Sequence, residues 1–443
     1  MKTHDPFISS LVATLVALFL WSSTSRAADP PPNVLLIISD DHGWSDYGFM
    51  GHAEISTPAL DRLARESLTF ERGYSPVPLC RPALASIVTG LYPHQHGVTG
   101  NDPELPDKTV NPQTQRTNPR FQPYYEKLTA RFASHPNFIR DLTSRGYVAL
   151  QTGKWWEGDP IKTAGFTHAM TQGVGKGGRH GDAGLAIGRE GLDPIYNFIR
   201  DARGKPFVVW YAPMLPHAPH NPPAALLERF QKPGVPPPVA AYRACVAWFD
   251  QTCGELLDFL ERENLRTNTI IFYTTDNGWI QDPKNPNRPA PRSKLTPYEG
   301  GVRTPIMISW LGQLKPRRDR DHLASNVDLW PTLAALLKIP APQGLPGINL
   351  TDLRAVQRRQ QIFGEHYPHN VLDVDSPTRG LEHRFVISDR WKLILPANAA
   401  AASAQAELFD LKKDPWELHN LAAKEARRVQ KLTRVLDQWW QGP

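Results

Sequence analysis

The sequence predicts an α/β domain built on a central, mostly parallel sheet flanked by helices, followed by a smaller C-terminal α+β subdomain. Three observations predict it: apolar runs of strand length recur along the chain, helical patterns lie between them, and the pattern changes near residue 345. With 40% hydrophobic and 21% charged residues among 443, the chain can bury a large core, which excludes disorder as its main state.

The strands are predicted from short runs in which nearly every residue is apolar, a pattern typical of strands buried on both faces. The five runs are Asn33–Ser39, Tyr147–Gln151, Phe207–Tyr211, Thr269–Thr274 and Ile306–Trp310. Because helical patterns alternate with these runs, we expect most of the strands to be parallel.

Helices are predicted where apolar residues recur every three or four positions. Thr57-Pro58 places an N-cap before a proline at the first helical position. Residues 240–263 form a longer helix, in which Cys245 and Cys253 are expected to be core residues. After about residue 345 the segments become shorter, and a charged helix at the end of the chain completes the smaller subdomain.

The first 27 residues have the features of a secretory signal peptide. Lys2 precedes an apolar run from Leu11 to Trp21, and a small-x-small cleavage pattern ends at Ala27. The run is too short to span a bilayer, so we expect a secreted or periplasmic protein without stable membrane insertion. A retained membrane anchor is the alternative.

Composition excludes some classes of partner and of scaffold. The formal net charge of +6 is modest for this length, and no dense block of Lys and Arg occurs, so we expect no nucleic-acid partner. Three cysteines cannot form a disulfide framework.

Polar and charged residues follow four of the apolar runs at the point where each run ends. They are Asp40-Asp41, Thr152-Gly153-Lys154, the segment from Pro213 through His217 to His220, and Asp276-Asn277-Gly278. Ligands bind beyond the carboxyl ends of the strands in parallel α/β sheets, so we expect these residues at one edge. The two acidic segments offer only oxygen ligands, which favours a hard cation such as Ca²⁺ or Mg²⁺ over zinc. The alternative is that they are ordinary turn residues.

Cys80 stands where a helix is predicted to begin, because Pro82 suits the first turn of a helix. The helix dipole at that position favours anionic character at the side chain and at any bound anion. A buried structural thiol is the alternative interpretation.

A set of motifs, in order along the chain, resembles the type I sulfatases. The motifs are Asp40-Asp41-His-Gly-Trp, Thr57-Pro-Ala-Leu-Asp-Arg-Leu-Ala64, Cys80-Arg-Pro82 with Thr89-Gly90, Thr152-Gly-Lys154, Asp276-Asn-Gly278, Lys294 with Tyr298-Glu-Gly-Gly-Val-Arg303, and Asp328-Leu-Trp-Pro-Thr332. The segment from Glu407 to Leu421 resembles the usual ending of the family. The resemblance covers Asn33 to about Leu421, nearly the whole chain after the signal segment.

The resemblance implies an alkaline-phosphatase-like sandwich. The predicted cleavage site and the change of pattern near residue 345 divide the chain into a catalytic domain over residues 28–345 and a C-terminal subdomain over residues 346–443. It also implies hydrolysis of a sulfate ester, for which a sulfated carbohydrate is the candidate substrate. In the family, a formylglycine-generating maturation enzyme oxidises the motif cysteine, here Cys80, and the hydrated aldehyde is the nucleophile.

The resemblance also assigns roles to single residues. A divalent cation, Ca²⁺ with Mg²⁺ as the alternative, would be held by Asp40, Asp41, Asp276, Asn277 and an oxygen of the modified Cys80. Lys154 and Lys294 would neutralise the charge of the transferring sulfuryl group. His217 would protonate the departing alkoxide as general acid. His220 matches no residue of the family and is expected on a loop or at the rim of the site.

Two positions depart from the family pattern. The family motif is Cys-x-Pro-x-Arg, and its Arg is replaced here by Leu84. Arg81 lies about 100° around the helix from that position and cannot simply replace it. The family has Lys-x-His after Thr-Gly, and here Trp156 replaces the His that helps regenerate the aldehyde.

Other residues could compensate for these departures. The Gly-rich stretch Gly173–Gly181 carries Lys176, Arg179 and His180, and His94 and His96 follow the helix of Cys80. Three functions therefore stay open: a sulfatase, a phosphate or phosphonate ester hydrolase of the same superfamily, and a degenerate protein that binds sulfated glycans without cleaving them.

Overall fold

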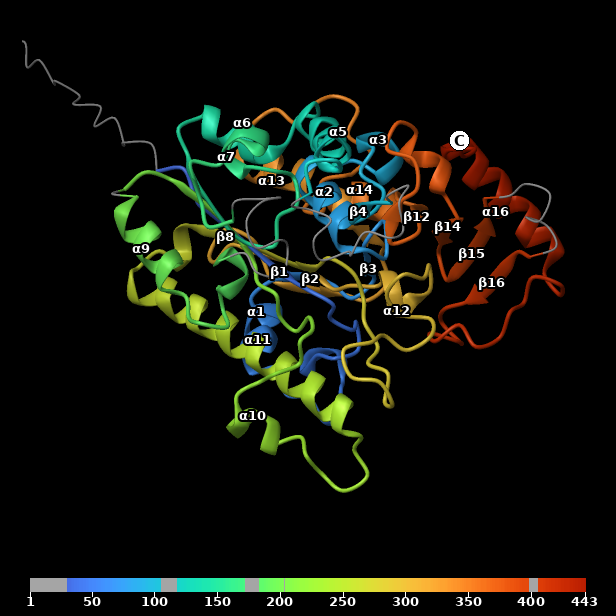
Figure 1. Ribbon diagram of the computed structural model, residues 1–443, viewed down its shortest axis with the longest axis horizontal. Helices are drawn as coiled ribbons and strands as arrows, with labels where there is room; N and C mark the ends of the chain where they lie inside the picture. The colour runs from blue at the N-terminus through green and yellow to red at the C-terminus, as the bar shows by residue number, and fades with distance from the viewer. Residues whose placement is uncertain (1–29, 105–117, 172–182, 203, 398–404) are drawn as a thin grey trace, which may run out of the picture. The chain divides into compact units, whose positions relative to one another are not determined.

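An eight-stranded sheet lies at the centre of the computed structural model (Figure 1). In spatial order its strands are β10 (Arg317–Asp319), β2 (Leu68–Phe70), β9 (Ile306–Ser309), β8 (Thr269–Thr275), β1 (Asn33–Ser39), β7 (Phe207–Ala212), β5 (Val148–Gly153) and β6 (His168–Ala169). Every neighbouring pair is parallel except the two pairs that include β9. The expected mostly parallel sheet is confirmed.

The structure describes residues 30–104, 118–171, 183–202, 204–397 and 405–443. The predicted signal segment, the Gly-rich stretch 173–181 and residues 398–404 lie outside these residues. Among the helices described, none combines the length and the apolar character needed to cross a membrane.

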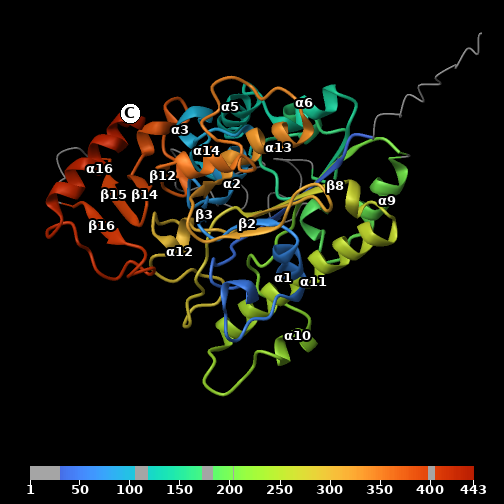
Figure 2. The same cartoon turned by 180° about the vertical axis from the view of Figure 1, so that it is seen from behind.

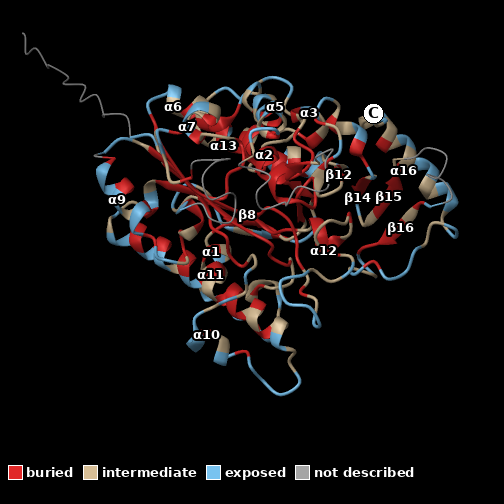
Figure 3. Cartoon of the chain, in the orientation of Figure 1, coloured by how far each residue is buried: buried red, intermediate tan, exposed pale blue. Residues whose placement is uncertain are grey.

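The sheet is sandwiched between two layers of helices because the side chains of its strands alternate in direction. In β1, Val34, Leu36 and Ile38 face one core, and Leu35 and Ile37 face the other. The first core is covered by α2 (Cys80–Thr89), α5 (Gln122–Ala133), α6 (Phe138–Ser144) and α13 (Leu329–Leu337). The second is covered by α1 (Pro58–Arg65), α9 (Asp193–Asp201) and α11 (Pro237–Arg262) (Figures 1 and 2). Figure 3 shows the strands as a buried layer between the helices. Cys245 and Cys253 are both fully buried on α11, as expected.

A second, antiparallel sheet forms near the C-terminus. Its strands are β12 (Gln361–His366), β14 (His383–Ser388), β15 (Trp391–Pro396) and β16 (Glu407–Asp410), and α16 (Ala426–Trp439) packs on one face. Helix α16 buries Leu432 and Leu436 against this sheet. The structure thus has the smaller C-terminal part that the sequence predicts.

Shorter elements connect these layers. They are β3 (Gly73–Tyr74), α3 (Pro93–His96), β4 (Asp102–Pro103), α7 (Pro160–Ala164), α10 (Ala224–Glu228), α12 (Glu299–Val302), β11 (Ala324–Ser325), α14 (Leu353–Arg358) and β13 (Asn370–Val371), with short 3-10 turns among them.

The register of the parallel strands brings their carboxyl ends to one edge. Ser39 at the end of β1 lies opposite Thr275 of β8, and Gly153 of β5 lies opposite Ala212 of β7. The residues that follow these strands therefore emerge side by side.

Candidate active site

Cys80 is the first residue of α2, and its side chain is buried. The helix begins there because Leu79 is extended while its carbonyl already accepts the N–H of Ala83. It ends at Gly90, which takes the left-handed conformation that favours glycine at this position.

Four oxygen-bearing side chains gather beside Cys80. Asp40 and Asp41 follow β1 directly, and Asp276 and Asn277 follow β8. The two strand ends stay joined, because the N–H of Asp276 donates to the carbonyl of Ser39 at 3.1 Å. Asp41 has a φ of 57°, and its N–H donates to Oδ1 of Asp276 at 3.2 Å. Asn277 Nδ2 donates to Oδ1 of Asp41 at 2.7 Å, so the four residues form one connected group.

Two lysines converge on the sulfur of Cys80. Lys294, on the loop before α12, places Nζ 3.0 Å from Sγ of Cys80 and 2.6 Å from Oδ1 of Asp41. Lys154, just after β5, places Nζ 3.7 Å from the same sulfur and 2.5 Å from Oδ2 of Asp40. The structure therefore brings both predicted lysines to the predicted nucleophile position.

The donor set fits a divalent cation. Oδ1 of Asp40, Oδ2 of Asp276 and Oδ1 of Asn277 are buried and have no hydrogen-bond partner in the described part of the chain. Potential ligand atoms of Asp40, Cys80 and Asp276 all lie within 4.8 Å of one another. Two ligands on opposite sides of a Ca²⁺ ion are about 4.6–5.2 Å apart, so one ion could contact all three.

The electrostatics of the site lead to the same conclusion. Burial raises the pKa of Asp40 well above its usual value, although Lys154 opposes this shift. Burial also raises the pKa of Asp276 against the opposing effect of the same lysine. Three carboxylates face two lysines, so ionising all three leaves one uncompensated negative charge, which a divalent cation would neutralise.

Burial also governs the thiol of Cys80. It raises the pKa of Cys80 to about 12, and this effect outweighs the opposing influence of Lys154 and Lys294. The helix dipole does not produce the anionic thiol that the position of Cys80 suggested, because the side chain is screened from water. An unmodified Cys80 is a neutral thiol near pH 7 and a poor nucleophile.

His217 lies on the segment that follows β7 and approaches Oδ2 of Asp41, whereas Asn277 contacts Oδ1. Its Nε2 is 3.5 Å from Oδ2 of Asp41, and its Nδ1 donates to the carbonyl of Ala218 at 2.5 Å. The segment is fixed to β1, because the N–H of Asp40 donates to the carbonyl of Leu215 at 3.0 Å. His217 thus presents Nε2 to the site.

Arg189 is a residue of this region that sequence reasoning missed. Its guanidinium donates to the carbonyls of Met214 at 2.9 Å and His217 at 2.8 Å, and to Oδ1 of Asn221. Arg189 therefore holds both ends of the segment that carries His217. No local pattern marks it, because all its partners are distant in sequence.

The position of the absent family arginine is apolar. Leu84 is buried among the residues of the first core. Arg81 turns away from Cys80 and forms a two-pronged ion pair with Glu157, at 2.7 and 2.8 Å. Its backbone N–H donates to Oδ1 of Asn101 at 2.9 Å. Arg81 therefore does not supply the missing guanidinium.

Trp156 occupies the position of the absent family histidine. Nζ of Lys154 lies 5.2 Å from the centre of the Trp156 ring, a distance suited to a cation–π contact. Trp156 thus stabilises the charge of Lys154 but offers no base.

The other candidates are used elsewhere or only approach the site. His94 pairs with Glu365 at 2.5 Å and stacks on Trp440, and His96 contacts Ser86 at 3.0 Å. His220 packs edge-on against Tyr242 and Trp279. Nζ of Lys294 lies 5.8 Å from the centre of the Trp279 ring. Because His220 contacts this same ring, it lies beside the site.

Comparisons with known proteins agree with this geometry. A family model described as "Sulfatase" matches residues 32–339, and a model described as "N-sulphoglucosamine sulphohydrolase, C-terminal" matches residues 293–440. The first match alone covers more than half of the chain.

Named relatives align along nearly the whole sequence. Human N-acetylgalactosamine-6-sulfatase is 29% identical over 468 residues, covering 93% of this chain and 85% of its own length. Human arylsulfatase A is 28% identical, covering 95% of this chain and 89% of its own. The crystal structure of the phosphonate monoester hydrolase of Agrobacterium radiobacter shares the fold, with a TM-score of 0.67 at 18% identity over 93% of this chain and 95% of that one. The chain therefore belongs to the type I sulfatase family of the alkaline phosphatase superfamily.

Proposed function

We propose that this protein hydrolyses the sulfate ester of a carbohydrate, using a formylglycine derived from Cys80. One observation carries the proposal: two lysines converge on the Cys80 side chain beside a buried group of oxygen ligands. The name of the 29% identical human relative, N-acetylgalactosamine-6-sulfatase, supports a carbohydrate substrate.

Each residue of the site has a role in this proposal. Asp40, Asp41, Asp276 and Asn277 would hold Ca²⁺ or Mg²⁺ together with the modified Cys80. The cation and the formylglycine would supply a Lewis acid and an oxygen nucleophile. Lys154 and Lys294 bind the anionic oxygens of the sulfuryl group and stabilise the charge that develops there. His217 transfers a proton from Nε2 to the alkoxide as the bond between sulfur and the ester oxygen breaks.

The proposal includes two events before catalysis. Residues 1–27 are removed during export to the periplasm or the exterior of the cell, and a formylglycine-generating enzyme converts Cys80. Both follow from the sequence features and the family, and both can be measured on protein from the native host.

Two residues favour a second candidate, a protein that binds sulfated glycans without cleaving them. Leu84 removes the arginine that stands next to the nucleophile in the family, and Trp156 removes a base. Lys154, Lys294 and a cation would still attract a sulfate group. A phosphate or phosphonate ester is a further possible substrate, in keeping with the shared fold of the phosphonate monoester hydrolase.

Mass spectrometry of the tryptic peptide containing Cys80, from protein made in its native host, is the first test. The proposal expects an aldehyde in place of the thiol. An unmodified thiol in the mature protein would overturn the sulfatase mechanism.

Assays with sulfate, phosphate and phosphonate esters side by side identify the reaction. The proposal expects the highest kcat/KM on sulfated sugars, and a loss of about 10²-fold or more in the Lys294→Ala variant. The Lys284→Ala variant, at an exposed lysine on the same loop, is the matched control and should keep full activity. Glycan binding without turnover by protein that carries the aldehyde would favour the second candidate.

A further inference from the structure

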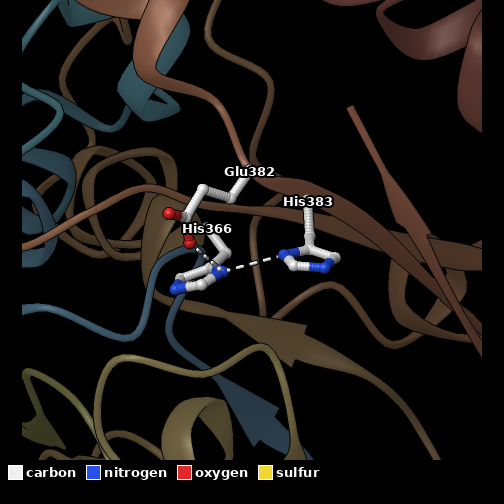
Figure 4. Close-up of side chains that lie close together, drawn as sticks. All are labelled: His366, Glu382 and His383. Carbon is white, nitrogen blue, oxygen red and sulfur yellow. Dashed lines mark hydrogen bonds and ion pairs between the residues drawn. The ribbon is translucent and has the colours of Figure 1, made fainter. Parts of the chain in front are cut away.

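The C-terminal sheet carries a group of metal-ligating side chains outside the site described above. His366 ends β12, His383 begins β14, and Glu382 directly precedes His383. Figure 4 shows the two imidazole rings and the carboxylate turned toward one another. Neither the family resemblance nor the proposed reaction uses these three residues.

The backbone fixes their arrangement. His366 lies directly opposite His383 in the antiparallel register of β12 and β14, so both side chains leave the same face of the sheet. The N–H of Glu382 donates to the carbonyl of His366 at 2.9 Å. The rings are nearly parallel, with 5.3 Å between their centres and 23° between their planes.

We propose that His366, Glu382 and His383 form a binding site for a transition-metal ion of the Zn²⁺ class. Nδ1 of His366 lies 3.0 Å from Nδ1 of His383 and 3.4 Å from Oε2 of Glu382 (Figure 4). Two ligands at 2.0–2.1 Å from a tetrahedral zinc ion are separated by about 3.3 Å. Both separations agree with that value to within a few tenths of an ångström.

The hydrogen bonding of His366 supplies an independent argument. The backbone of Leu295 also approaches this ring. The N–H of Leu295 already donates to the carbonyl of Pro78, so the Leu295 carbonyl is the group that can accept a proton from the ring. Nε2 of His366 is the nitrogen that can donate to it, because Nδ1 faces Glu382 and His383. In that tautomer of the neutral ring, Nδ1 carries a lone pair.

Without an ion, this lone pair can accept the Nδ1–H of His383 at 3.0 Å; a cation bound between the two rings and Oε2 of Glu382, 3.4 Å away, would take the place of that proton. A backbone carbonyl at the second ring nitrogen is also the usual arrangement behind a metal-binding histidine. Two nitrogens and one carboxylate suit zinc and its neighbours, in contrast to the oxygen ligands around Asp40.

The proposed site is open to solvent on one side. The side chain of His366 is 9% exposed and that of Glu382 is 47% exposed. A metal ion can therefore enter past Glu382, and water can complete the tetrahedron as the fourth ligand. Because Leu295 follows Lys294, an ion here would join the ends of β12 and β14 to the loop that carries Lys294.

Equilibrium dialysis with Zn²⁺ tests the proposal. All proteins carry Cys80→Ala and are kept in excess Ca²⁺, so that neither the thiol nor the carboxylates of the active site take up zinc. We expect one zinc ion per chain, and an affinity at least about tenfold lower in the His383→Gln and Glu382→Gln variants. The His419→Gln variant, at an exposed histidine outside the cluster, should bind zinc as the parent does.

Cobalt provides a second readout that does not depend on affinity. Co²⁺ bound by two histidines and a carboxylate gives visible absorption bands, which should disappear in His383→Gln and persist in His419→Gln. His383 and Glu382 are not fully buried, so these variants are suited to test binding in a folded protein, and a thermal melt without metal verifies the fold. Absence of zinc binding in the parent, or equal binding in all variants, would overturn the proposal. The result is independent of whether Cys80 is converted or any ester is cleaved.

Discussion

Arg81 shows how a charged residue next to the nucleophile position is kept out of the site. Its guanidinium and the carboxylate of Glu157 are both almost fully buried, and they satisfy each other through two hydrogen bonds. Buried pairs of this kind gain little over an apolar pair, but removal of one partner leaves an uncompensated charge. Arg81 therefore has a structural role near Cys80.

The Arg81→Met variant should lower the free energy of unfolding by about 3–5 kcal/mol, because Glu157 is left buried and unpaired. The double variant Arg81→Met, Glu157→Met should recover most of this loss. Urea unfolding measures both. Arg145→Met, which breaks the exposed pair with Asp141, is the control and should cost less than about 1 kcal/mol. Equal costs for Arg81→Met and the double variant would contradict this account.

The sequence allowed prediction of the site residues that directly follow strands. Asp40 and Asp276 come after continuous apolar runs, and the parallel register then brings them together. Lys294 lies on a loop without a periodic pattern, so only the family resemblance pointed to it. Arg189 and Glu157 could not be found, because their roles depend on partners far away in sequence.

Gly153 is the last residue of β5, and its backbone conformation places Lys154 in the site. Gly153 has a φ of 75°, and a Cβ there would lie 1.9 Å from the carbonyl oxygen of Ala212 on β7. The N–H of Lys154 donates to this same oxygen at 2.8 Å. Any side chain at position 153 must therefore separate the ends of β5 and β7.

Substitution at two glycines with similar φ angles distinguishes this clash from the ordinary cost of a left-handed alanine. Gly234 has a φ of 82°, and a Cβ there would meet no atom within 4 Å. Gly234→Ala should cost about 1–2 kcal/mol. Gly153→Ala should cost clearly more and should also weaken the binding of sulfate esters through Lys154. Denaturant unfolding and substrate titration measure the two effects, and equal costs at both positions would count against the clash.

A buried ion network joins the C-terminal sheet to the helix that follows the Lys294 loop. Lys392 on β15 lies 3.1 Å from Glu299 of α12 and 3.0 Å from Glu417, and all three side chains are buried. Glu299 is also paired with Arg303 at 3.7 Å, whereas Glu417 shares Lys392 with it. Burial accordingly raises the pKa of Glu417 to about 7, against the opposing effect of Lys392.

This shift predicts a pH dependence of stability with a definite sign. Unfolded Glu417 loses its proton near its usual value of 4.5, whereas folded Glu417 keeps it until about pH 7. The folded state therefore binds more protons between these values, and its stability falls as the pH rises through this window. Glu417→Gln mimics the protonated form and should lack this decline. In thermal melts from pH 4.5 to 8, the melting temperature of the variant should rise relative to that of the parent as the pH increases. Parallel curves of melting temperature against pH would be inconsistent with the pKa shift of Glu417.

The long buried strands were predictable because β1, β5, β7 and β8 are apolar on both faces. The short strands β2, β6 and β10 were not predicted, because two or three residues carry no periodic pattern. The direction of β9 could not be predicted either. Its antiparallel course depends on the path of the chain between residues 275 and 306, which the strand's own composition does not encode.

At the scale of the whole molecule, the proposed cation should stabilise the fold as well as the site. In its absence, three buried carboxylates face two lysines across the ends of β1 and β8. An ion that binds only the folded chain at 100 times its Kd adds about 2.7 kcal/mol to the free energy of unfolding. Protein treated with EDTA should therefore melt at a lower temperature than protein in excess Ca²⁺.

The Asp276→Asn variant tests whether this residue binds the cation, because its effect on the melting temperature should differ between EDTA and excess Ca²⁺. The amide oxygen of Asn can still accept the N–H groups of Asp41 and Asn277 that Oδ1 of Asp276 now accepts. Because burial favours the neutral form of Asp276, the variant should melt no lower than the parent in EDTA. In excess Ca²⁺ it should melt lower, because one charged ligand is lost. Asp201→Asn, at an exposed carboxylate at the end of α9, should keep the full response to Ca²⁺. If Asp276→Asn is shifted equally with and without Ca²⁺, Asp276 does not bind the cation, and the charges of the site must be balanced by protonation instead.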